Sequence, residues 1–76
     1  MKQMDSLDLH SIRHGEVDKL LHDFIYEHIQ RGSTEVKIIT GKSPQMKEIV
    51  NEIVNSYDMS TSEEWGNNGS LILDMK

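Results

Sequence analysis

The spacing of apolar residues changes several times along the chain, and each change predicts a new element. Around residues 4–10 apolar and polar positions are interleaved, which is typical of a half-buried strand. From Glu16 the apolar residues recur at the spacing of one helix face: Val17, Leu20, Leu21, Phe24, Ile25 and Ile29. This helix should end at Arg31 and Gly32, because a cation suits the helix C-terminus and glycine readily adopts the left-handed cap.

A second strand and a second helix are predicted next. Residues 35–40 concentrate β-branched side chains, and this strand should stop at Gly41. Ser43 and Pro44 then predict a helix start, because serine accepts a hydrogen bond from an unpaired backbone amide and proline has no amide to lose. The apolar face of this helix is Met46, Ile49, Val50, Ile53, Val54 and Tyr57.

The last part of the chain predicts a terminal hairpin. Residues 59–65 alternate weakly between apolar and polar, and residues 70–75 are the most strand-like segment of the chain. The GNNG stretch at residues 66–69 suits a tight turn with positive φ angles. The predicted order of elements is therefore β-α-β-α-β-β.

Size, composition and charge limit the classes of function. A chain of 76 residues has room for one domain over residues 1–76, frayed at 1–3 and 76, and for a shallow site rather than a deep cavity. The absence of cysteine excludes disulfides and thiolate zinc sites. No apolar run has the length of a signal peptide or a membrane span, so we expect a soluble, cytoplasmic protein without membrane contact. The net charge of −5 repels polyanions at long range, so any nucleic-acid contact must be local.

The predicted order places two polar loops at one edge of the sheet. If the first two strands are parallel and joined by a right-handed helical crossover, the loops that follow them lie together. Ligands of open α/β sheets usually bind at this edge. The HSIR segment at residues 10–13 and the TGKS segment at residues 40–43 should therefore face each other.

The TGKS segment has the parts of a phosphate-binding turn. It leads a strand into a helix N-terminus and offers free amides, the positive end of a helix dipole, a hydroxyl and an ammonium group. It is not a P-loop, which needs more residues between its glycines. An ordinary capped turn between a strand and a helix explains the same residues equally well.

Asp8 and His10 form the second candidate group. Residues two apart on a strand leave the same face, in this case opposite to Leu7 and Leu9. A carboxylate beside an imidazole can orient it for acid/base work or share a metal with it. Arg13, at the start of the first helix, would stabilise the extra negative charge of a phosphodiester transition state. The alternative is that Asp8 only caps or solvates the end of a strand.

Three stretches together resemble a known family. LDLHSIR at residues 7–13, VKIITGKS at residues 36–43 and NNGSLILDM at residues 67–75 look like the Smr domain, the small MutS-related module. The marks of that family are LDLHxxR and a TGxG or HGxG turn after the second strand. The first motif is matched in full, whereas Ser43 stands in place of the second glycine of TGxG and Ser11 replaces the glycine that usually follows LDLH.

The resemblance implies a two-layer α/β sandwich with a mixed four-stranded sheet and two helices, similar to the C-terminal domain of a bacterial translation initiation factor. It also implies binding of DNA or RNA and, in several members, endonuclease activity. By position it makes Asp8, His10 and Arg13 the catalytic candidates. The phosphate-binding candidates are Thr40, Gly41, Lys42, Ser43 and, as an auxiliary contact, His14. A divalent metal such as Mg²⁺ or Mn²⁺, if one takes part, would be bound by Asp8 and His10.

Two classes of function remain open from the sequence. The first is an endonuclease that cleaves phosphodiester bonds, and the second is a non-catalytic module that binds nucleic acid or a protein partner through the same edge. A side chain at Ser43 would hinder close approach of a phosphate, or it would cap the helix and add a hydroxyl. The acidic charge balance argues against strong nucleic-acid binding.

The remaining polar and aromatic residues support weaker expectations. We expect His22 to face solvent and His28 to lie at the edge of the apolar helix face, rather than to bind a metal. Lys37, in the middle of the second strand, should be a solvated surface residue. Trp65 is either a packing residue of the hairpin or a stacking platform for a base.

Overall fold

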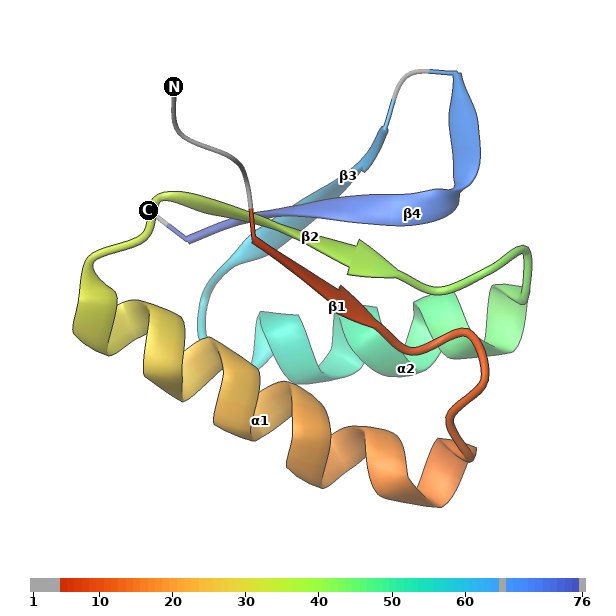
Figure 1. The fold of residues 1–76 in the computed structure, drawn as a ribbon, viewed down its shortest axis with the longest axis horizontal. Helices are drawn as coiled ribbons and strands as arrows, with labels where there is room; N and C mark the ends of the chain where they lie inside the picture. The colour runs from red at the N-terminus through yellow and green to blue at the C-terminus, as the bar shows by residue number, and fades with distance from the viewer. Residues whose placement is uncertain (1–4, 65, 76) are drawn as a thin grey trace.

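A computed structural model describes residues 5–64 and 66–75. Within these residues the chain forms four strands and two helices in the predicted order (Figure 1). The elements are β1 (Ser6–Asp8), α1 (His14–Arg31), β2 (Glu35–Ile39), α2 (Pro44–Asn55), β3 (Ser60–Glu64) and β4 (Asn67–Asp74). The predicted fraying at residues 1–3 and 76, and both readings of Trp65, lie outside the described residues.

The four strands form one mixed sheet in the order β1-β2-β4-β3. β1 runs parallel to β2, whereas β4 is antiparallel to both β2 and β3. Both helices lie against the same face of this sheet, and no described element covers the opposite face (Figure 1). The predicted two-layer α/β sandwich is confirmed.

The ends of the helices follow the sequence signals closely. Gly32 adopts a φ angle of 74° after α1, and its N–H donates to the carbonyl of Ile29 at 3.1 Å, which confirms the predicted left-handed cap. The hydroxyl of Ser43 accepts a hydrogen bond from the backbone N–H of Met46 at 3.1 Å. The predicted helix cap at Ser43 is therefore also confirmed.

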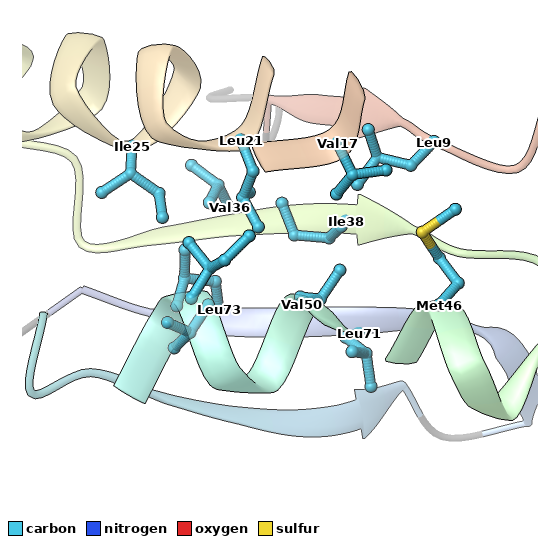
Figure 2. Packing of buried hydrophobic residues seen from close by; sticks show 12 residues of the cluster. Leu9, Val17, Leu21, Ile25, Val36, Ile38, Met46, Val50, Leu71 and Leu73 are labelled. Carbon is cyan, nitrogen blue, oxygen red and sulfur yellow. The ribbon is translucent and has the colours of Figure 1, made fainter. Parts of the chain in front are cut away.

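One apolar core fills the space between the helices and the sheet (Figure 2). Among the described residues its twelve buried side chains are Leu9, Val17, Leu21, Ile25, Val36, Ile38, Met46, Val50, Ile53, Val54, Leu71 and Leu73. Burying each such side chain contributes about 1.5–3 kcal/mol to stability. Leu20 and Ile29, which we expected on the buried face of the first helix, are 39% and 46% exposed because they lie at the two margins of that face.

The terminal hairpin turns earlier than the sequence predicts. The GNNG stretch was expected to form the turn, yet β4 already begins at Asn67, and of the two glycines in the stretch only Gly66 has a positive φ angle, of 76°. Gly69 is part of β4, and its carbonyl accepts hydrogen bonds from the backbone N–H groups of Thr40 and Gly41 in the turn after β2. β1 likewise ends before residue 10, since its register with β2 stops at Asp8 and one further backbone hydrogen bond, from Leu9 to Ile39, follows it.

The longest described helix, α1, is amphipathic rather than uniformly apolar. No helix in the described part of the chain is both long enough and apolar enough to cross a membrane.

Candidate functional site

The loops that follow β1 and β2 lie side by side at one edge of the sheet. Figure 1 shows both loops leaving the sheet on the right, each leading into a helix. The backbone N–H of Leu9 donates to the carbonyl of Ile39 at 2.7 Å. A Cβ atom added at Gly41 would lie 3.3 Å from the Cβ of His10. The prediction that the two loops face each other is confirmed at His10 and Gly41.

Asp8 and His10 form a hydrogen-bonded pair on the rim of this edge. The Oδ1 atom of Asp8 accepts from the backbone N–H of His10 at 3.1 Å and from the ring Nδ1–H of the same residue. Both side chains are more than half exposed, at 52% for Asp8 and 57% for His10. The pair is therefore fixed in orientation and still open to solvent.

The bond has a direct electrostatic consequence. The side-chain hydrogen bond from His10, followed by the backbone N–H of His10, lowers the pKa of Asp8 below its ordinary value of 3.8. Asp8 is consequently an anion at neutral pH. Because Nδ1 is engaged with this anion, Nε2 is the ring atom through which His10 can exchange a proton with a substrate.

A third segment, from the start of β4, binds the turn at Thr40 and Gly41. The carbonyl of Gly69 accepts the backbone N–H of Thr40 at 2.9 Å and that of Gly41 at 3.0 Å. Thr40 is only 2% exposed, and its hydroxyl donates to the carbonyl of Gly41 at 2.8 Å. The amides of Thr40 and Gly41, which the sequence assigns to a phosphate cradle, are therefore engaged within the protein.

The three segments enclose a shallow depression of about 430 Å³. Its lining residues are Asp8, His10, Lys37, Ile39, Gly41, Lys42, Gly69 and Ser70. Side chains alternate across a strand, so Lys37 and Ile39 point away from the core residues Val36 and Ile38. The depression therefore lies on the uncovered face of the sheet, where that face meets the loop edge.

The candidate residues separate into two groups. Asp8, His10, Gly41 and Lys42 share the depression. Arg13 and His14 stand at the N-terminus of α1, Ser43 caps α2 and Thr40 is buried, and none of these four lines the depression. Arg13 occupies the N-cap position and makes no side-chain capping bond.

Four further residues line the site without a motif that predicts them there: Lys37, Ile39, Gly69 and Ser70. Their placement follows from strand register, because Ile39 pairs with Asp8 on one side and with Ser70 on the other. Lys37, expected to be solvated, is only partly exposed. Side chains alternate along β2, so the sequence does indicate that Lys37 and Ile39 share a face. No other sequence signal places these residues in the site.

Two histidines are placed differently from expectation. His28 is 2% exposed, its Nδ1 lies 2.8 Å from the hydroxyl of Ser33, and its ring packs against Phe24 at a centroid distance of 4.4 Å. His22 is half-buried and hydrogen-bonded to the hydroxyl of Tyr57, which links α1 to the end of α2. His28 is buried rather than at an edge because it lies three and seven residues after core positions of α1.

The donor set does not fit a resident divalent metal. Within the described residues there is no group of three or more histidine, aspartate or glutamate side chains that could hold one. Asp8 and His10 are bonded to each other, and Lys37 and Lys42 line the same depression with positive charge. A hard cation such as Mg²⁺ requires several oxygen ligands, which this arrangement does not supply.

The fold and the site define a class of protein: a small α/β sandwich with an acid–imidazole pair and a glycine turn at the carboxyl edge of a mixed sheet. The chain belongs to the Smr domain family, whose model matches residues 7–76. Smr domains bind nucleic acids, which agrees with the lysines in the depression.

Two solved structures have the same fold. The Smr domain of Thermus thermophilus MutS2 superimposes with a TM-score of 0.85 at 14% sequence identity, over 96% of this chain and 99% of that chain. The solution structure of the SMR domain of NEDD4-binding protein 2 gives a TM-score of 0.74 at 23% identity, over 100% of this chain and 90% of that chain. Comparison with curated protein sequences gave no significant match.

Proposed function

We propose that this Smr domain is an endonuclease that binds DNA or RNA at the depression and cleaves a phosphodiester bond there. The observation that carries this proposal is the fixed Asp8–His10 pair, which lies in the same depression as Lys42. A carboxylate that orients a solvent-accessible imidazole is an arrangement suited to general acid/base catalysis.

Each residue has a separate chemical role in this proposal. A hydroxyl nucleophile, either water or the 2′-OH of RNA, attacks phosphorus and gives its proton to Nε2 of His10. The bond between phosphorus and the leaving oxygen then breaks, and that oxygen takes up a proton from solvent. Asp8 stabilises the imidazolium that forms, and Lys42 stabilises the charge on the non-bridging oxygens.

In this proposal Gly41 leaves space for its neighbour and does not donate its N–H to the substrate. Its φ angle is 69°, its N–H is engaged with Gly69, and its lack of a side chain leaves room for His10. The phosphate contact of the TGKS turn therefore falls on Lys42. Ser43 is occupied as a helix cap, so the missing second glycine of the family motif does not close the depression.

A non-catalytic binding module is the second candidate function. The position of Arg13 favours it, because this candidate for transition-state stabilisation does not line the depression. In that case the same edge would bind nucleic acid or a protein partner without cleaving it.

Cleavage assays on supercoiled DNA and on structured RNA separate the two functions. The wild-type protein is compared with Asp8→Asn and His10→Ala, each with added Mg²⁺ and with chelator. His14→Ala is the matched control, because His14 is an exposed histidine outside the depression. The endonuclease proposal is supported if His14→Ala still cleaves while Asp8→Asn and His10→Ala do not. Gel shifts without cleavage in the wild-type protein and all variants would leave only the binding module.

A further inference from the structure

The depression extends beyond the loop edge onto the uncovered face of the sheet. Lys37 and Ile39 of β2 and Ser70 of β4 belong to its lining. Lys37 and Ile39 are partly exposed, whereas Ser70 is only 2% exposed. These three residues lie on the open face, away from Arg13 and His14 on the helix layer.

The strand register arranges the open face into rows. Asp8, Ile39 and Ser70 form one row across three strands, because Asp8 pairs with Ile39 and Ile39 pairs with Ser70. Adjacent strands are about 4.8 Å apart, so this row is about 10 Å wide from Asp8 to Ser70. Lys37 lies in the next row, paired with Ile72, about 7 Å along β2 from Ile39.

Along β2 and the turn that follows it, the lining residues run from one cation, Lys37, past the apolar Ile39 to a second cation, Lys42. Lys42 is at the loop edge, Ile39 forms the floor and Lys37 lies further along the open face. At about 3.3 Å per residue, Lys37 and Ile39 lie about 7 Å apart along β2, and Lys42 follows in the turn beyond the end of the strand. Two phosphates contacted by Lys42 and Lys37 would therefore flank the apolar floor.

The apolar floor restricts the form of the nucleic acid. A phosphate gains nothing from contact with Ile39, whereas the apolar face of an unstacked base does. In a duplex the faces of the bases are hidden in the stack, whereas a single strand presents unstacked bases to a protein surface. The row beside Asp8 and His10 thus suits a single-stranded segment.

We propose that the uncovered face of the sheet binds single-stranded nucleic acid, with its backbone following β2 from Lys42 to Lys37 and a sugar or base above Ile39. This inference rests on the proposed function and makes Lys37 a nucleic-acid-binding residue. It also places the bound nucleic acid on the face of the sheet opposite the two helices.

Equilibrium binding of a short fluorescent oligonucleotide and of its blunt duplex tests the proposal, with Lys37→Gln as the variant. Lys19→Gln is the matched control, because Lys19 is an exposed lysine on α1 and its loss changes the net charge equally. We expect the single strand to bind more tightly than the duplex. We expect Lys37→Gln to weaken single-strand binding by about 5-fold and to reduce the slope of log K against log salt by about 0.7, with Lys19→Gln close to wild type.

A second variant and thermal unfolding separate loss of the lysine charge from loss of folding. Lys37→Arg retains the cation and should retain the salt slope, and thermal unfolding shows whether each variant is folded. The inference is overturned if Lys37→Gln and Lys19→Gln bind the single strand equally strongly, or if the wild-type protein binds the duplex more tightly than the single strand. Either result leaves the proposed function standing. A wild-type protein that binds neither nucleic acid overturns the proposed function itself.

Discussion

Gly41 lies so close to His10 that a Cβ atom at position 41 would approach the Cβ of His10 to 3.3 Å. The same glycine has a φ angle of 69°, a conformation that side chains with a Cβ rarely adopt. Gly41 therefore meets two requirements at once, one from its own backbone and one from the neighbouring His10.

Gly41→Ala should lose both stability and function. The left-handed conformation alone costs about 1–2 kcal/mol for a residue with a Cβ, and the added methyl would also displace His10. Gly32→Ala is the control, because Gly32 has a similar φ angle of 74° but nothing within 4 Å of an added Cβ. Chemical denaturation and nucleic-acid binding or cleavage measure the two effects. Equal function in the two variants would show that the contact with His10 is unimportant.

Asp8 should remain ionised at a lower pH than an ordinary aspartate. His10 lowers the pKa of Asp8 below 3.8 in the folded protein, so the resulting stability is present above that value and is lost as the pH falls through the lowered pKa. Carboxyl NMR titration of the wild type and His10→Ala measures this directly. The pKa of Asp8 should rise in His10→Ala, and an unchanged titration would contradict the side-chain hydrogen bond.

Lys42→Gln should weaken nucleic-acid binding more than Arg13→Gln. Both changes remove one positive charge, but Lys42 lines the depression and Arg13 does not. A lysine that contacts a phosphate contributes to the salt dependence of binding, so only Lys42→Gln should reduce that slope, by about 0.7–0.9. Fluorescence anisotropy over a range of salt concentrations gives both quantities. A larger effect at Arg13 would move the binding site to the helix layer.

Ser43→Ala should destabilise the protein without affecting binding. Its hydroxyl caps α2, and removal of such a cap costs about 1 kcal/mol, whereas glycine at the same position costs only a few tenths. Thermal or denaturant unfolding of Ser43→Ala and Ser43→Gly distinguishes these values. If Ser43→Ala were as stable as the wild type but bound nucleic acid weakly, the hydroxyl would be a ligand contact and not a cap.

His28→Ala should be the most destabilising of the histidine substitutions. His28 is buried against Phe24, and its removal leaves a cavity and deprives Ser33 of a hydrogen-bond partner, at a cost of about 2–4 kcal/mol. His14→Ala, at an exposed position, should change stability little. Denaturant unfolding of the two variants provides the comparison, and equal stabilities would contradict the buried placement of His28.

The sequence predicts the elements of this fold because their signals are local. The apolar spacing of both helices, the cap at Ser43 and the left-handed Gly32 depend only on residues a few positions apart. The meeting of His10 with Gly41 was also predictable, since it follows from two parallel strands joined by a helix.

The floor of the site was not predictable in the same way. Ser70 and Gly69 enter the depression only because β4 pairs with β2 in one particular register, and the sequence does not specify that register. The sequence likewise does not indicate that the Thr40 hydroxyl is buried and donates to the carbonyl of Gly41. Contacts between distant segments decide which polar groups remain available to a substrate.

The hydrogen bonds from Thr40 and Gly41 to the Gly69 carbonyl also determine when the site can form during synthesis. A nascent chain that ended before β4 would contain every residue of both loop motifs but no acceptor for these two amides, and the floor at Ser70 would be absent. The ribosome must therefore release nearly the whole domain before a binding surface exists.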